Sequence, residues 1–178
     1  MGPKHSREQI LEGALEAALE DGLSQLTFGR LAKRLGVSDR MVVYYFPTKD
    51  ALVGEVLLTM GLQLQGVLAA AFTTTADDYL ELARAAWPTL ARPEVDPVFG
   101  LFFEANGLAA AGREPYTTLV PTLIEAWIDW VTTFLSGPPA RRRTEAETAI
   151  ALLDGLLLLR QLAGADAADR AARRLGFR

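Results

Sequence analysis

Residues 27–50, TFGRLAKRLGVSDRMVVYYFPTKD, decide how the N-terminal part of this chain folds. Four apolar residues in the first half recur at the spacing of one helix face: Phe28, Leu31, Ala32 and Leu35. Thr27 stands where it can cap this helix. Gly36 follows the last apolar residue, where a left-handed conformation ends a helix at little cost. The pattern therefore predicts a short helix that ends in a tight turn.

A second short helix is predicted directly after this turn. Ser38 stands at a position that can cap it. Val42 and Phe46 are four residues apart, so they share one face and can pack back on the first helix. The remaining side chains then face outward: Asp39, Arg40, Met41, Tyr44 and Tyr45. Outward aromatic side chains and an arginine on so short a helix indicate that it binds a partner.

Residues 7–57 resemble the N-terminal helix-turn-helix of tetracycline-repressor-type (TetR family) regulators. The resemblance rests on the turn at Gly36 and on the ordered motif at 44–49, Tyr-Tyr-Phe-Pro-Thr-Lys. Two positions depart from the family, because Val43 stands where a tyrosine is usual and Tyr45 where a histidine is frequent. The resemblance implies an all-α fold, a homodimer that binds double-stranded operator DNA, and a small-molecule effector bound by the C-terminal helices.

The chemistry of the outward residues fits DNA. In helix-turn-helix proteins the N-terminal part of the second helix meets base edges in the major groove. Arg40 can bond bidentately to guanine, whereas Met41 can make only apolar contact. Tyr44 and Thr27 are expected at phosphates, and Lys49, at the start of the next helix, is expected to clamp another. The predicted DNA-binding residues are Thr27, Ser38, Asp39, Arg40, Met41, Tyr44, Tyr45 and Lys49.

Other residues of this region are open to two interpretations. The basic residues of the first helix either form a solvated face or touch DNA, and they are Arg30, Lys33 and Arg34. Tyr44 and Tyr45 could be ordinary packing residues. Glutamates four residues apart form a ladder on the preceding helix, which we expect to point away from DNA: Glu8, Glu12, Glu16 and Glu20.

The composition excludes several classes of function. The chain has 178 residues, no cysteine and one histidine, His5. We do not expect His5 to bind a metal ion. Disulfides, iron–sulfur clusters and a cysteine nucleophile are therefore excluded, and no metal-binding, nucleotide-binding or hydrolase motif is recognisable. We expect neither an enzyme nor a cofactor. The polar start and the short apolar run at 149–159, which Asp154 interrupts, predict a cytoplasmic protein that does not span a membrane.

Beyond Phe46 the sequence predicts helices throughout, separated by breaks rather than by strands. We divide the chain into a helix-turn-helix DNA-binding domain at 1–47 and a larger helical ligand-binding and dimerisation domain at 48–178. The helices of the larger domain are expected at 48–72, 76–91, 96–111, 114–135, 144–163 and 166–175. The arginine run 141–143 is interpreted as a solvated loop.

Two segments of the larger domain bear on function. Aromatic residues gather around Pro88 and Pro121, which lie inside helical patterns, so these helices could line a cavity for a largely apolar effector. Large aromatics at helical spacing are also frequent in cores. The predicted ligand-binding residues are Trp87, Phe102, Phe103, Glu104, Asn106, Tyr116 and Trp127.

The segment 144–163 is apolar all round, which predicts that one face covers the core and another a second subunit. Asp154 and Arg160 would be either interface groups or satisfied core polar residues. The predicted interface residues are Ile150, Leu153, Asp154, Leu157 and Arg160.

These observations favour a ligand-responsive, DNA-binding transcriptional regulator, most simply a repressor, that binds a pseudo-palindromic operator as a homodimer. The alternative is a ligand sensor or protein-interaction module on the same fold that does not touch DNA. The net charge of −4 leaves this alternative open, because DNA-coating proteins are basic throughout.

Overall fold

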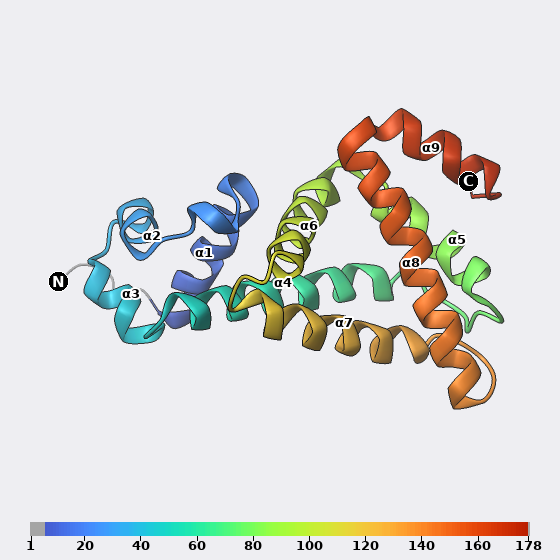
Figure 1. The fold of residues 1–178 in the computed structure, drawn as a ribbon, viewed down its shortest axis with the longest axis horizontal. Coiled ribbons are helices and arrows are strands. Elements are labelled where there is room, and N and C mark those ends of the chain that lie inside the picture. The colour runs from blue at the N-terminus through green and yellow to red at the C-terminus, as the bar shows by residue number, and fades with distance from the viewer. Residues whose placement is uncertain (1–5, 178) are drawn as a thin grey trace. The chain divides into compact units, whose positions relative to one another are not determined.

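The computed structural model describes residues 6–177 and is almost entirely helical, as predicted (Figure 1). His5, which we do not expect to bind a metal ion, lies outside the described residues. The α-helices are α1 (Arg7–Asp21), α2 (Phe28–Leu35), α3 (Asp39–Tyr45), α4 (Lys49–Ala69), α5 (Tyr79–Leu90), α6 (Asp96–Ala110), α7 (Tyr116–Thr132), α8 (Pro139–Ala163) and α9 (Ala165–Arg174). Two short 3-10 helices, η1 (Leu23–Gln25) and η2 (Pro93–Val95), complete the set within 6–177.

Local signals set the bounds of the first helices. At the start of α1 a capping box is closed in both directions, since Ser6 and Gln9 each accept the backbone N–H of the other. The Thr27 hydroxyl accepts the N–H of Arg30 at 3.3 Å, and α2 ends at Gly36, whose φ of 66° is left-handed. The cap at Thr27 and the turn at Gly36 were both predicted from the sequence, whereas the capping box of α1 was not.

Two expectations about helix starts need correction. Ser38 stands at the N-cap of α3, but its side chain makes no capping hydrogen bond. The arginine run 141–143 is not a loop, because α8 begins at Pro139 and includes it. Proline is favoured at the first helical position, and the pairs Arg141–Glu145 and Arg143–Glu147, each four residues apart, support the first turns.

The chain forms two compact units by its internal contacts. The first contains the residues up to Gln63 together with Gly100–Val120, and the second contains Leu64–Phe99 and the residues from Pro121 onward. The helices α4, α6 and α7 each run from one unit into the other. The functional boundary expected after residue 47 stays a prediction, and the helix-turn-helix packs in one unit with residues 100–120.

The core of the first unit holds α2 and α3 together. Val42 and Phe46 are fully buried, as predicted from their spacing. Close packing also joins α1 to α2, because a Cβ at Gly13 would come within 2.5 Å of the Leu35 side chain. Arg7 adds a tie to α4, since its guanidinium bonds Glu55 at 2.6 Å and lies 4.9 Å from the centre of the Phe46 ring.

The core of the second unit is an aromatic and aliphatic cluster. Its buried members are Ala76, Leu82, Ile128, Val131, Leu135, Ala146 and Ala149. Phe72, Trp127 and Trp130 pack against it with their rings in edge or tilted contact. The helix α8 packs on α5 and α9. An isolated parallel bridge joins the backbones of two members of this cluster, Ala76 and Leu135.

One described helix, α4, is long and apolar enough to cross a membrane, with a mean hydropathy of 1.5. This is weak evidence, because the core helix of a soluble protein passes the same test, and 39% of its most apolar window is buried inside the protein.

Phe46→Ala should lower the free energy of unfolding by about 3–5 kcal/mol, because the ring is 1% exposed and its removal leaves a cavity beneath α3. Val43→Ala is the matched control, since Val43 is 42% exposed on the same helix and should cost about 0.5 kcal/mol. Urea unfolding followed by circular dichroism measures both. Equal losses would mean that α3 is not held by its buried face.

Candidate nucleic-acid interface

The outer face of α3 presents Arg40 without any competing partner. Its side chain is exposed and forms no hydrogen bond or ion pair with residues 6–177. Tyr44 is 78% exposed and meets the half-buried Tyr45 edge to face, with ring centres 5.0 Å apart. Met41 is half-buried. A guanidinium with five free donors and a phenol hydroxyl therefore project from one short helix.

Further polar groups lie at the starts of α3 and α4. The Ser38 hydroxyl, which forms no cap, is exposed at the start of α3. The Thr48 hydroxyl accepts the N–H of Ala51 at 3.1 Å, so the predicted cap of α4 is present. Next to it, Lys49 is exposed and unpaired within the described part of the chain. A cation beside a helix N-terminus is suited to hold a phosphate.

Asp39 has a local role besides any contact with DNA. A Cβ built at Gly29 would lie 3.6 Å from its carboxylate, which places the charge beside the first turn of α2. Negative charge is favourable near a helix N-terminus. The Asp39 carboxylate therefore lies close to the start of α2, and its DNA contact stays a prediction.

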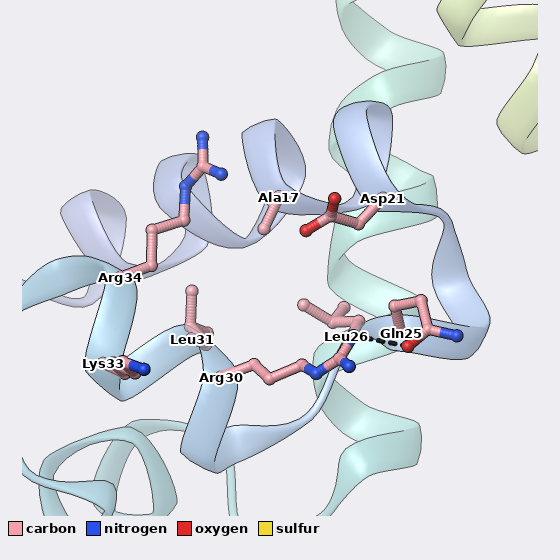
Figure 2. Close-up of a pocket in the computed structure, with 8 residues that line it drawn as sticks. All are labelled: Ala17, Asp21, Gln25, Leu26, Arg30, Leu31, Lys33 and Arg34. Carbon is pink, nitrogen blue, oxygen red and sulfur yellow. Dashed lines mark hydrogen bonds between the residues drawn. The ribbon is translucent and has the colours of Figure 1, made fainter.

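The basic residues of α2 differ in how they are engaged (Figure 2). Arg34 donates to the Glu20 carboxylate at 2.7 and 2.9 Å and also lies 3.8 Å from Glu16. These bonds lower the pKa of Glu20 and raise that of Arg34. Arg30 donates to the side chain of Gln25. Lys33 keeps a free ammonium group among the described residues.

Together these side chains line an open pocket of about 380 Å³ between α1 and α2. Figure 2 shows Arg30 beside Gln25 at one side of it and Ala17 with Asp21 at the other. The lining residues are Ala17, Asp21, Gln25, Leu26, Arg30, Leu31, Lys33 and Arg34. The glutamate ladder of α1 thus neutralises Arg34, which fits the interpretation of a solvated face better than a DNA contact.

Five of the predicted ligand-binding residues lie in the first unit. Phe102 and Phe103 have ring centres 5.4 Å apart. Asn106 has a buried side-chain oxygen without a hydrogen-bond partner among the described residues. Tyr116 is buried, and its pKa is raised first by burial and then by the charges of Glu104 and Asp50.

Glu104 behaves differently from this group. Its carboxylate accepts hydrogen bonds from the backbone of Leu23 and Ser24 at 2.8 and 2.9 Å, and from the Ser24 hydroxyl at 2.6 Å. Both oxygens are therefore occupied. Nothing in the sequence near Glu104 signals this contact, because its partners lie about eighty positions away.

The other two predicted ligand residues lie in the second unit. Trp87 is buried beside Phe177, with ring centres 6.2 Å apart. Trp127 packs edge to face on Trp130 at 5.2 Å, against the core cluster. Both tryptophans thus pack against other aromatic side chains, in line with the core-packing alternative that the sequence left open. Their contact with a ligand stays a prediction.

Most of the predicted interface residues of α8 are directed into their own subunit. Leu153 and Leu157 are buried, and Ile150 packs on the core cluster. Arg160 is buried and donates to both oxygens of Asp96 at 2.5 and 3.0 Å, so it is a satisfied core group. The exposed apolar residues of α8 are Leu158, Leu159 and Leu162. A helix apolar all round gives no sequence signal for which face is covered.

Asp154 forms no hydrogen bond or ion pair with the described residues. It is partly buried on α8, and this burial raises the pKa of its carboxyl group to about 6. It is thus not a satisfied core group among the described residues, and its place at a subunit interface stays a prediction.

Comparison with known proteins settles the class of the N-terminal domain. Residues 10–56 match the sequence profile of bacterial regulatory proteins of the tetR family. This segment is therefore similar to the DNA-binding helix-turn-helix of TetR-family regulators. The match lies within the resemblance seen at 7–57, and TetR-family regulators are not enzymes. No curated protein matches the chain.

Solved structures share the TetR fold along the whole chain. A transcriptional regulator from Rhodococcus sp. Rha1 is 22% identical, with a TM-score of 0.73 over 97% of this chain and 95% of that one. A protein from Saccharomonospora viridis in complex with choline is 18% identical, with a TM-score of 0.71 over 96% and 93%. The multidrug-binding protein EbrR, complexed with proflavin, is 27% identical, with a TM-score of 0.65 over 95% and 98%.

Asp154→Asn should stabilise the protein at pH 8 and do so less at pH 4.5. The folded state raises the pKa of Asp154 from 3.8 to about 6, so it favours the protonated form, and stability is lost as the pH rises between these values. The gain at pH 8 should be on the order of 2 kcal/mol. Urea unfolding at both pH values measures it.

The control is Asp129→Asn, because Asp129 is 76% exposed and should give no comparable pH-dependent gain. A gain from Asp154→Asn that is the same at both pH values would show that its charge is not the cause.

Proposed function

We propose that this protein is a cytoplasmic, ligand-responsive transcriptional repressor that binds a pseudo-palindromic DNA operator as a homodimer. The observation that carries the proposal is the exposed, unpaired Arg40 on the second helix of a TetR-type helix-turn-helix. An arginine held free at this position is placed to read a base edge.

Sequence reading and backbone anchoring are assigned to different residues. Arg40 would bond bidentately to guanine, and Met41 would make apolar contact with a neighbouring base. The phosphates on either side would be held by the Tyr44 hydroxyl and by Lys49 at the start of α4. Thr27, Ser38, Asp39 and Tyr45 complete the proposed surface, so that it contains all eight residues predicted from the sequence.

The proposed effector is a small, largely apolar molecule. Proteins of the same fold were solved with choline and with proflavin, which supports a ligand-binding role for this chain. In this chain the unpartnered oxygen of Asn106 and the buried Tyr116 are polar groups that an effector could satisfy. The apolar contacts are assigned to Phe102 and Phe103, which lie in the same unit as Asn106 and Tyr116.

Switching follows from a difference in affinity between two states. An effector that binds the chain better when the reading helices are wrongly spaced shifts the population away from DNA binding, and only by that difference. Two recognition helices need a separation of about 34–36 Å to enter successive major grooves. The operator affinity therefore depends on the arrangement of two subunits.

The proposed dimer surface is the exposed face of α8. Leu158, Leu159 and Leu162 are 41%, 36% and 79% exposed. A Cβ at the neighbouring Gly155 would meet nothing within 4 Å, so a partner helix can approach closely there. A second copy of the same face would cover these leucines across a two-fold axis.

Selection of binding sites from a random duplex library with the purified protein tests the proposal. Enrichment of a two-fold symmetric site is the expected result. If no sequence is enriched even at low salt, the chain is better described as a ligand sensor that does not read DNA.

Arg40→Ala should relax the preference at one base pair of each half-site, with a loss of about 1–3 kcal/mol at that position. Lys49→Ala should instead weaken binding to all duplexes alike. It should also reduce the slope of log affinity against log salt concentration by about one, because one phosphate contact is lost. Fluorescence anisotropy titrations against the selected site and its single substitutions measure both effects.

The matched control for these variants is Lys33→Ala, which removes an exposed, unpaired cation from α2 and should leave the affinity unchanged if this face is solvated. Loss of the same size at every sequence for both Arg40→Ala and Lys49→Ala would contradict the division of roles.

Leu162→Glu should convert the dimer to a monomer and lower operator affinity, because it places a charge on the proposed interface. Sedimentation velocity gives the molecular mass directly. The control is Leu58→Glu, at a residue 48% exposed on α4, which should remain dimeric. If both variants remain dimeric, the interface does not include Leu162 and lies elsewhere on the chain.

A further inference from the structure

The carboxylate of Glu104, on α6, holds the corner of the chain between α1 and α2. It accepts three hydrogen bonds there, from the N–H of Leu23 at 2.8 Å, the N–H of Ser24 at 2.9 Å and the Ser24 hydroxyl at 2.6 Å. We call this set of contacts the Glu104 clamp. Charge-assisted bonds of this kind are about twice as strong as neutral ones, so the clamp is a substantial local constraint.

The clamp satisfies groups that the short helix η1 cannot satisfy itself. The N–H groups of Leu23 and Ser24 come first in η1 and have no acceptor within the turn. Gly22, just before them, has a φ of 87°, and a Cβ there would come within 2.8 Å of the Glu104 carboxylate. A glycine at this corner thus meets two needs at once, the left-handed backbone and the space for the carboxylate.

The clamped corner leads directly into the DNA-reading helices. Leu23, the first residue of η1, and Leu26, directly after it, are buried in the first unit. The next residue is Thr27, whose hydroxyl caps α2 and which is itself a proposed phosphate contact. Any displacement of η1 therefore changes where α2 starts, and α3 packs on α2.

The helix that carries Glu104 is also fixed at its other end. Asp96 begins α6 and holds the buried Arg160 of α8 through two hydrogen bonds, while Gln161 donates to the Asp96 backbone at 2.8 Å. Between Asp96 and Glu104 the helix is continuous, and its Phe99 and Leu101 are buried. Glu104 thus stands on a continuous helix that is partly buried.

We propose that Glu104 is a positioning residue for DNA reading, because its carboxylate holds η1, and with it the start of α2, in the arrangement that α2 and α3 need to bind DNA. The inference rests on the proposed function. It assigns Glu104 to the support of the reading helices rather than to contact with the effector, because both of its oxygens already have partners.

Glu104→Gln tests the clamp with almost no change in shape. The amide has a single acceptor oxygen, so the N–H of Leu23 or Ser24 would lose its acceptor and face a donor instead. Two measurements are made on the full-length protein, the affinity for the selected operator and the amide hydrogen exchange of Leu23 and Ser24 by NMR. Both are carried out far below the melting temperature of each variant.

The expected result is operator affinity weaker by about tenfold, with unchanged base preference and unchanged salt dependence, and faster exchange of the two amides. Because the variant remains folded under these conditions, an unfolded fraction does not explain the loss. Ser24→Ala removes the hydroxyl donor alone and should give a smaller loss. The control Glu12→Gln removes an exposed, unpaired carboxylate of α1 and should change neither measurement.

Three results would overturn the inference. Wild-type operator affinity in Glu104→Gln would remove its role in DNA reading, and unchanged exchange of Leu23 and Ser24 would show that the clamp does not hold η1. A uniform effect of Glu12→Gln and Glu104→Gln would assign the loss to net charge. If the wild-type protein itself selects no duplex, the proposed function fails first, and the role of Glu104 in DNA reading fails with it.

Discussion

A helix of seven residues is unstable by itself in water, so α3 exists only because Val42 and Phe46 are buried beneath it. This packing fixes the rotation of α3 about its axis. With the apolar pair directed inward, Arg40 and Tyr44 have no position but the outer face. The chemistry offered to DNA is therefore a consequence of core packing, and the reader is as rigid as the small core that supports it.

The distribution of ion pairs decides which cations are available on the first unit. Arg34 is held by Glu20 and Glu16, whereas Arg40 and Lys49 have no anionic partner among residues 6–177. The glutamates of α1 thus suppress one potential DNA contact without affecting the others. A protein with few free cations binds nonspecific DNA weakly, which favours discrimination by base contacts and by two subunits acting together.

Local signals in the sequence were sufficient for the helix-turn-helix. A cap at Thr27, a turn at Gly36 and a spacing of four residues between buried side chains all act within a few positions of each other. The features that the sequence did not reveal depend on distant residues. Glu104 meets its partners across about eighty positions, and only tertiary packing decides that α8 buries Leu157 and exposes Leu162. The helical start of α8 was missed because two prolines were taken as a break rather than as the first turn.

The two compact units share three continuous helices, and the unit that contains the DNA reader includes residues 100–120 from the middle of the chain. Such a head is not a removable module. A fragment ending after α3 would lack Glu104 and Glu55, the partners of η1 and Arg7, together with the α6 and α7 segments of its own core. Exchange of heads between related proteins would therefore have to carry this internal segment along.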